Sequence, residues 1–328
     1  MAVQKIIIDC DPGIDDALAL VLAHGHPDLE LCGITTVAGN VSLDWTTANA
    51  LAMRDFLGMG NVPVVAGSPG PLLGAVLDAR HVHGETGLAG VMLPAPTREA
   101  HSGHAVDYLI DEISSAPGEI TLVAVGPLTN IALAVRRYPA LVDQVRDFVI
   151  MGGSAGRGNA TPAAEFNIAA DPAAGSIVFD AGWTVTMVGL DVTLQARATA
   201  AVCARIAGLG RLAEELVLPI VAGYRNTGGA EEGAVPLPLG QLVTDDDHAP
   251  AVHDVCAVAH VVDPALLRLT PAQVRVETTG RLTCGMTVTD FAAPVERHNA
   301  MVATGIDVPG FWDLVLDGYT RAAEGMPA

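Results

Sequence analysis

Four carboxylates lie within eight residues near the start of the chain, in the stretch DCDPGIDD: Asp9, Asp11, Asp15 and Asp16. Two unit charges 4 Å apart repel each other by about 4 kcal/mol at an effective dielectric constant near 20, so four carboxylates in one place need a cation or shared protons. The nearby ligands are hard oxygens, without paired histidines or cysteines, which favours Ca²⁺ or Mg²⁺ over zinc. The stretch therefore predicts a site for a hard divalent cation, with a helix cap followed by solvated acids as the alternative.

The elements on either side of these acids explain how they are positioned. Residues 5–10 (KIIIDC) form the continuous β-branched run typical of a strand buried on both faces, and residues 14–24 have the pattern of a helix. The Pro-Gly pair between them supplies a sharp turn. In an open α/β sheet, ligands bind beyond the carboxyl ends of the strands, and the acids lie at such an end.

Strand-like and helix-like segments alternate over the first two thirds of the chain. We expect further strands at 29–37, 62–66, 120–125, 148–151 and 185–190, and helices at 44–57, 128–137 and 171–179. The last of these helices has Asp171 as its N-cap and Pro172 at its first position. This alternation predicts an α/β fold with a Rossmann-like open, mostly parallel sheet and helices on both faces.

The last third of the chain is mixed. Helices are expected near 212–225, 252–261 and 311–322, and β-like runs near 273–277 and 285–290. We expect a single domain over residues 1–328, with a variable loop or insertion at about 226–250, because a loop of that length in a compact domain is usually functional or disordered.

Composition excludes several classes of function. Seventeen basic residues against 37 acidic ones give a net charge of −20, which repels phosphate backbones and anionic lipid, so neither nucleic acid nor a membrane is an expected partner. Lys5 is the only lysine, so no P-loop is present. The five cysteines form no CxxC pair, and the chain begins without the pattern of a signal peptide, so we expect a cytoplasmic protein without a disulfide framework.

A series of short motifs matches a known family. The stretch IIIDCDPGIDDALAL (6–20) closely resembles the opening motif of the inosine–uridine preferring nucleoside hydrolases. Further matches follow in the same order: VAGN (37–40), HVHGETG (81–87), VGPLTN (125–130), MGG (151–153), Asn159 with PAAEFN (162–167), and His253-Asp254. One such motif is a weak signal, whereas seven in the same order are a strong one.

The resemblance implies both an activity and a metal. The family hydrolyses the N-glycosidic bond of ribonucleosides, such as inosine or uridine, to free base and ribose, and it uses one bound Ca²⁺. Its metal ligands correspond here to Asp11, Asp16, Asp254 and the backbone carbonyl of Val125. Asp11 would be the general base that activates a water on the metal, since a cation lowers the pKa of such a water.

The resemblance also assigns the residues that would hold the sugar and the base. Asn40 would help to hold the water, and Met151 would pack beneath the sugar. The ribose hydroxyls would be bound by Asp15, Asn159, Glu165, Asn167 and Asp254. An imidazole suits proton donation to the leaving base; His253 is the first candidate because it precedes Asp254, and His83 is the second.

Two other functions remain open from the residues alone. A DxD after the first strand also opens the haloacid-dehalogenase-type phosphohydrolases, although these usually need a later lysine, which is missing here. A non-catalytic ribose- or nucleoside-binding protein is the second, because fold analogy does not fix function. The resemblance implies a homodimer or homotetramer, and few aromatic residues (4%) leave the base preference undecided.

Overall fold

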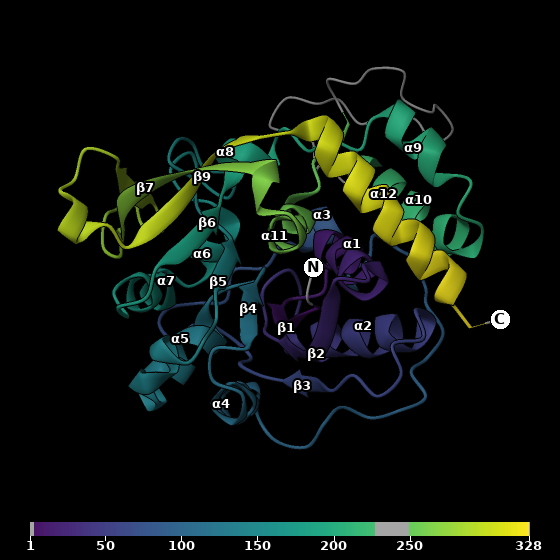
Figure 1. Cartoon of the computed structure of the whole chain (residues 1–328), viewed down its shortest axis with the longest axis horizontal. Coiled ribbons are helices and arrows are strands. Elements are labelled where there is room, and N and C mark those ends of the chain that lie inside the picture. The colour runs from purple at the N-terminus through teal and green to yellow at the C-terminus, as the bar shows by residue number, and fades with distance from the viewer. Residues whose placement is uncertain (1–2, 227–248, 328) are drawn as a thin grey trace.

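A computed structural model describes residues 3–226 and 249–327. Within them, the strands form one sheet: β1 (Gln4–Cys10), β2 (Leu29–Thr36), β3 (Val64–Ala66), β4 (Ile120–Ala124), β5 (Phe148–Met151), β6 (Val185–Val188), β7 (Leu267–Val276), β8 (Thr287–Asp290) and β9 (Ala300–Ile306). Their order is β3-β2-β1-β4-β5-β6-β9-β7-β8. Figure 1 shows this arrangement for the strands that it labels, which are all but β8. The strands from β3 to β9 in this order run parallel, and β7 and β8 are added antiparallel.

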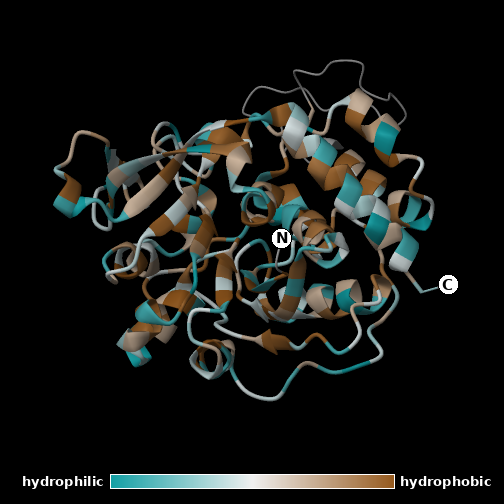
Figure 2. Cartoon of the chain, in the orientation of Figure 1, coloured by the Kyte–Doolittle hydropathy of each residue, from teal (hydrophilic) through white to brown (hydrophobic). Residues whose placement is uncertain are grey.

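The central strand β1 faces two hydrophobic cores. Ile6 and Ile8 belong to the core on one face of the sheet, whereas Ile7 belongs to the core on the other. All three side chains are fully buried. Because successive strand residues point to opposite faces, only a strand that is covered on both sides needs a continuous apolar run. Figure 2 shows hydrophobic residues along the strands and the inner sides of the helices.

Helices cover both faces of the sheet. One face carries α1 (Ile14–Gly25), α2 (Leu43–Phe56), α9 (Ala200–Ile206), α10 (Leu218–Asn226), α11 (His253–Val262) and α12 (Val308–Gly325), and the other carries α4 (Ala105–Ser115), α5 (Thr129–Arg137) and α7 (Pro172–Phe179). Short turns of helix complete the fold: α3 (Arg80–His83), α6 (Phe166–Ala170), α8 (Leu190–Thr193), η1 (Pro139–Asp143), η4 (Pro264–Leu266), η5 (Val295–Arg297) and the π-helical η2 (Ala213–Val217). The predicted α/β fold with a mostly parallel sheet is confirmed.

The structure differs from the predicted elements mainly in the second half of the chain. The sequence analysis predicted neither α4 nor β9, and β7 begins at Leu267 rather than near 273. The helix expected at 212–225 is divided into η2 and α10. Most of the loop expected at 226–250 lies outside the described residues. Among the described residues, no helix is both long and apolar enough to cross a bilayer.

The strand order predicts a crevice at the carboxyl end of β1. From β1 the chain moves outward to β2 and β3, then returns to the opposite side of β1 for β4, β5 and β6. This is the strand order of dinucleotide-binding folds, in which ligands bind where the order reverses, beyond the carboxyl ends of the strands. The reversal lies between β1 and β4, so the acids after β1 and the segment after β4 border the same crevice.

Candidate active site

Asp16 organises the turn between β1 and α1. Its Oδ1 accepts a hydrogen bond from the backbone N–H of Asp11 at 3.0 Å, and its Oδ2 accepts one from the N–H of Gly13 at 2.9 Å. A carboxylate in the first turn of a helix satisfies N–H groups that would otherwise have no partner. Asp16 thereby fixes the backbone that carries Asp11, and both side chains are fully buried.

Asn40, which follows β2, holds Asp11 from the other side. Its backbone N–H donates to Asp11 Oδ2 at 2.6 Å, while its side-chain Nδ2 donates to Asp11 O and to Asp16 Oδ2, both at 3.1 Å. A Cβ at Gly39 or Gly126 would overlap the Asp11 carboxylate, so glycine allows both loops to approach it. Asp11 Oδ1 is buried, and within residues 3–226 and 249–327 no group donates a hydrogen bond to it.

Asp9 is bound inside the sheet rather than in the crevice. Its Oδ1 accepts hydrogen bonds from Thr35 Oγ1 at 2.5 Å and from Asn130 Nδ2 at 2.8 Å, and burial raises its pKa to about 7. Asn130 also donates to Thr36 O at 3.0 Å and accepts from the N–H of Ser68 at 2.9 Å. It therefore joins the carboxyl ends of β1 and β2 to the segment after β3. The sequence analysis assigned no role to Asn130, although its VGPLTN motif marked the position.

Four buried carboxylates share the crevice: Asp11, Asp15, Asp16 and Asp254. Burial raises the pKa of Asp11, and the negative charge of Asp16 adds to the shift. The pKa of Asp15 is raised by the same two causes, although this side chain accepts a hydrogen bond from the backbone N–H of His253. Burial and the charges of Asp16, Asp15 and Asp11 raise the pKa of Asp254, which α11 brings to the other acids from more than 200 residues away in the sequence.

The oxygens of these four carboxylates are the kind of ligand that a hard cation prefers. Among the described residues, no three His, Cys, Asp or Glu side chains are already arranged as a metal-binding group. However, Asp11 Oδ1 and Asp15 Oδ1 are both buried, and neither receives a hydrogen bond from the part of the chain that the structure describes. An unpaired buried carboxylate oxygen is energetically costly. A divalent ion would satisfy such oxygens and remove the repulsion between the carboxylates.

Asn167 and Glu165 hold the loops that follow β4 and β5. Asn167 Nδ2 donates to the backbone carbonyls of Val125 at 2.9 Å and Met151 at 3.0 Å. Glu165 is buried as the N-cap of α6 and accepts from three backbone N–H groups, those of Gly153, Asn167 and Ile168. Burial nevertheless raises the pKa of Glu165 to about 7.

Asn159 contacts the loop before α6 and not the four carboxylates of the crevice. The side chain is exposed, and its Oδ1 accepts a hydrogen bond from the backbone N–H of Phe166 at 2.9 Å. This bond fixes the loop before α6, so Asn159 supports the segment that carries Glu165.

His83 reaches the crevice from α3. Its Nδ1 accepts a hydrogen bond from the backbone N–H of Ile14 at 3.1 Å, and its ring stacks on Tyr224 with 6.5 Å between centroids. Because a backbone N–H can only donate, the proton of the neutral imidazole is on Nε2. Burial, aided by His253 and His81, lowers the pKa of His83 to about 3.

His253 is the first residue of α11, directly before Asp254. Its Nδ1 lies 2.8 Å from Thr193 Oγ1, a partner that the sequence analysis missed because no local pattern links α8 to α11. Burial and then the charge of Arg197 lower the pKa of His253 to about 4. The helix N-terminus also disfavours a cation at this position. Both histidines are therefore neutral at pH 7 in this structure.

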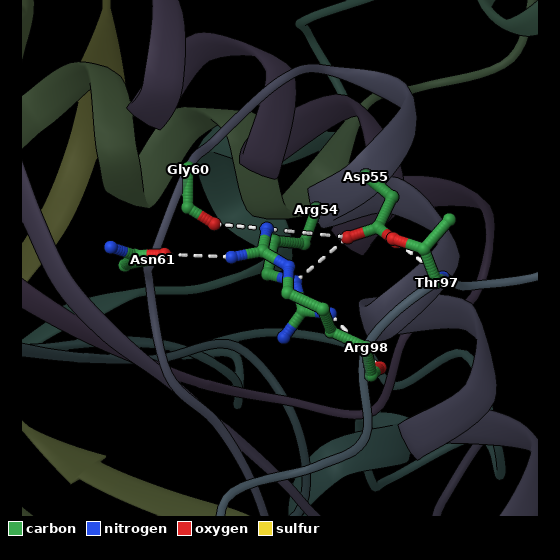
Figure 3. A network of polar contacts seen from close by, with 6 residues as sticks. All are labelled: Arg54, Asp55, Gly60, Asn61, Thr97 and Arg98. Carbon is green, nitrogen blue, oxygen red and sulfur yellow. Dashed lines mark hydrogen bonds and ion pairs between the residues drawn. The ribbon is translucent and has the colours of Figure 1, made fainter.

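The segment after His83 is fastened by the polar network drawn in Figure 3. Asp55 Oδ2 accepts from the N–H and the Oγ1 of Thr97 at 2.6 and 2.7 Å, and Asp55 Oδ1 pairs with Arg54 Nε at 3.0 Å. Arg98 Nη1 donates to Asn61 Oδ1 at 2.8 Å. Partial burial opposes ionisation of Asp55, but the bonds from Thr97 and Arg54 lower its pKa to about 2. The network ties residues 97–98 to the end of α2.

Comparison with known proteins settles the family. A sequence profile described as inosine-uridine preferring nucleoside hydrolase matches residues 6–313. The chain belongs to this nucleoside hydrolase family. Its members hydrolyse the N-glycosidic bond of ribonucleosides, so the predicted enzyme class is confirmed, and membership removes the phosphohydrolase and the non-catalytic binder as alternatives.

Individual nucleoside hydrolases match almost the whole chain. The inosine-uridine preferring nucleoside hydrolase of Leishmania major is 45% identical over 98% of this chain and 99% of its own length. The pyrimidine-specific ribonucleoside hydrolase RihB of Escherichia coli is 41% identical, with the same coverage. The structure of a purine-preferring ribonucleoside hydrolase from Gardnerella vaginalis gives a TM-score of 0.88 at 32% identity, over 98% of this chain and 99% of that one. These names specify different bases, so membership establishes the bond that is cleaved and leaves the base open.

Proposed function

We propose that the protein is a Ca²⁺-dependent ribonucleoside hydrolase in which Asp11 is the general base. The observation that carries the proposal is Asp11 Oδ1, a buried carboxylate oxygen to which no group among the described residues donates a hydrogen bond. Asn40 and Asp16 hold the remainder of Asp11 in place. An oriented carboxylate with a raised pKa and a free oxygen is suited to accept a proton from an attacking water.

Asp11, Asp16, Asp254 and the carbonyl oxygen of Val125 would hold the ion. Val125 O accepts one hydrogen bond from Asn167, which leaves a second lone pair for a cation. When bound, the ion would supply positive charge that offsets the repulsion among the carboxylates and acidifies water nearby. The chemistry of the donors favours Ca²⁺, because each is a hard oxygen.

The remaining polar groups would bind the sugar. Asp15 Oδ1 is buried and has no hydrogen-bond partner among the described residues, which supports a bond to the 2′-hydroxyl. Asn167 would bind the same hydroxyl. Asp254 would bind the 3′-hydroxyl, and Glu165 and Asn159 the 5′-hydroxyl, while Met151 would pack beneath the ring. A pocket with this much negative charge stabilises the positive charge that develops on ribose as the base leaves.

His253 is the first candidate for the group that assists the leaving base, and His83 is the second. Both are neutral, so assistance would take the form of hydrogen-bond donation from a ring N–H to the base as its bond to ribose breaks. We also infer a single domain, a homodimer or homotetramer, and a cytoplasmic location.

A panel of ribonucleosides tests this proposal. Release of free base and of reducing sugar is measured with and without a calcium chelator, for the wild type, Asp11→Ala and Asp11→Asn. We expect both variants to lose about 10²–10⁴-fold in kcat, which is the usual contribution of a general base, and the chelator to abolish turnover. Asp317→Asn, which removes an exposed surface charge, serves as the control.

Near-wild-type turnover by a correctly folded Asp11→Asn variant would reject Asp11 as the base. Full activity after exhaustive chelation would reject the metal dependence while leaving the base assignment intact.

A further inference from the structure

We propose that Thr193 is a positioning residue for the leaving-group step, because its hydroxyl donates a hydrogen bond to His253 Nδ1 and thereby keeps the imidazole proton on Nε2. The inference rests on the proposed function of His253. Thr193 is the last residue of α8 and lies outside the seven short motifs named in the sequence analysis. It would contact neither sugar nor base.

The direction of this hydrogen bond follows from the burial of Thr193. The residue is fully buried. Among the described residues, its hydroxyl oxygen has one hydrogen-bond partner, His253 Nδ1, and the two atoms are 2.8 Å apart. If Nδ1 carried the proton, it would donate to Oγ1 and the hydroxyl hydrogen would be buried without an acceptor. An unsatisfied buried donor costs about 1–3 kcal/mol, so the arrangement with the hydroxyl as donor is favoured.

The backbone around Thr193 is held on one side by the loop after β5. The N–H of Leu190 donates to Gly153 O at 3.0 Å, and the N–H of Ala155 donates to Asp191 Oδ2 at 2.8 Å. A Cβ at Gly189 would lie 2.6 Å from Gly153 O, so this close approach requires glycine. The short helix α8 is therefore fixed relative to the sheet.

A second set of bonds fixes the distance between Thr193 and His253. The N–H of Ala198 donates to Pro250 O at 2.8 Å, and the N–H of Val252 donates to Ala196 O at 2.9 Å. These bonds form a short antiparallel bridge between the segment after α8 and the segment before α11. The residues that carry the hydroxyl and the imidazole are thus joined by backbone pairing, which makes their contact a built feature of the fold.

The tautomer decides what His253 can do in the reaction. A neutral imidazole has one N–H, and only the nitrogen that carries it can donate to the leaving base. His83 is fixed in the same tautomer by the backbone N–H of Ile14, because a backbone N–H can donate a hydrogen bond but cannot accept one. For His253, a hydroxyl takes that role, so replacing the hydroxyl releases the constraint on this imidazole alone.

Thr193→Val and Thr193→Ser test the inference with two substrates. Inosine and uridine need assistance to the leaving base, whereas 4-nitrophenyl riboside has an activated leaving group that departs without it. We expect Thr193→Val, which removes the hydroxyl at nearly constant volume, to lower kcat for the nucleosides by about 10- to 100-fold, as loss of a group that orients a functional histidine commonly does. The kcat for 4-nitrophenyl riboside should change less than threefold, and Thr193→Ser should restore nucleoside turnover.

Thr121→Val is the matched control, because it removes another buried threonine hydroxyl that lies in the interior of β4. It should leave the ratio of the two substrates unchanged. Wild-type kinetics in Thr193→Val, or equal losses on both substrates, would overturn the inference. Failure of the wild type to release base from any nucleoside would instead reject the proposed function.

A direct measurement avoids reliance on any variant. The ¹⁵N chemical shifts of the His253 ring in the wild-type protein distinguish a protonated Nε2 from a protonated Nδ1. We expect Nδ1 to be unprotonated at pH 7, and a protonated Nδ1 would overturn the inference regardless of how Thr193→Val folds.

Discussion

Gly13 lies where the turn after β1 meets two candidate active-site side chains. Its φ of −108° is accessible to any residue, so the backbone alone does not demand glycine. A Cβ at this position would lie 2.5 Å from His83 Nδ1 and 2.7 Å from Asn40 Nδ2. The requirement for glycine is therefore set by the packing of the site.

Gly13→Ala should consequently damage both activity and stability. The added methyl group must displace the imidazole or the carboxamide, and a displacement of about 1 Å at a reacting group can cost about 10²-fold in rate. We expect kcat for nucleosides to fall by about that factor, with a change in unfolding free energy of about 1–3 kcal/mol. Gly208→Ala, where the nearest atom is 4.0 Å away, is the control. Unchanged kcat in Gly13→Ala would show that the site tolerates this displacement.

His83 predicts a dependence of stability on pH. Its folded-state pKa of about 3 lies below the value near 6.5 in an unfolded chain, so the folded protein binds fewer protons. This contribution to stability is present above pH 6.5 and is lost as the pH falls towards 3. At pH 5 the loss is on the order of 2 kcal/mol for this one group.

Urea unfolding at pH 7.5 and pH 5.0 checks this prediction. Between these values, His83→Gln should lose about 2 kcal/mol less than the wild type, because glutamine cannot be protonated. Asp9 and Glu165 have raised pKa values and shift stability in the opposite direction, but both proteins carry them, so the comparison isolates His83. If the wild type and His83→Gln lost the same unfolding free energy between pH 7.5 and pH 5.0, the lowered pKa of His83 would be contradicted.

At the scale of elements, the network around Asp55 anchors the segment between α3 and α4. Asp55→Ala removes both bonds to Thr97 and leaves Arg54, which is only 4% exposed, without its carboxylate. We expect a loss of about 1–3 kcal/mol in stability, as for other buried partners left unpaired, and faster amide hydrogen exchange in residues 84–100. Asp317→Ala breaks an exposed pair with Arg321 and should cost less than about 0.5 kcal/mol. Unaltered exchange in residues 84–100 would show that the network does not anchor them.

Elements with a strong local signal were predictable from the sequence. The KIIIDC run became β1, and Asp171 with Pro172 begins α7, where the Asp171 side chain accepts from the N–H of Ala174. By contrast, Pro271 lies inside β7, where a proline is normally avoided, so the pattern delayed the predicted start of that strand. The short strand β9 depends on β6, more than 100 residues earlier, for its parallel partner, and no local pattern encodes that pairing.

The site was predictable in the same uneven way. The residues of the DCDPGIDD stretch were identifiable because their charges are concentrated in one turn. The contacts that orient them depend on backbone geometry across the crevice: the N–H of Asn40 on Asp11, the N–H of Ile14 on His83, and Thr193 on His253. Such bonds involve main-chain atoms or residues without a motif, so the sequence carries little signal for them.

At the scale of the whole molecule, the buried carboxylates predict that a cation stabilises the fold. Asp11, Asp15, Asp16 and Asp254 repel one another without a counter-charge, so binding of Ca²⁺ should favour the folded state. At 100 times the Kd the gain is about 2.7 kcal/mol, which should raise Tm by several degrees. Differential scanning calorimetry with Ca²⁺ and with chelator measures this shift. Asp254→Asn should reduce it, and a Tm that is independent of Ca²⁺ would contradict the expectation.

The strand order also has a consequence for biosynthesis. The first acids of the crevice leave the ribosome with β1, whereas Asp254 and the bridge between residues 196–198 and 250–252 are made much later. A nascent chain therefore carries Asp11 and Asp16 before the groups that enclose them exist. If Asp254 completes the site as proposed, catalytic competence arises only in the final stage of translation or after release.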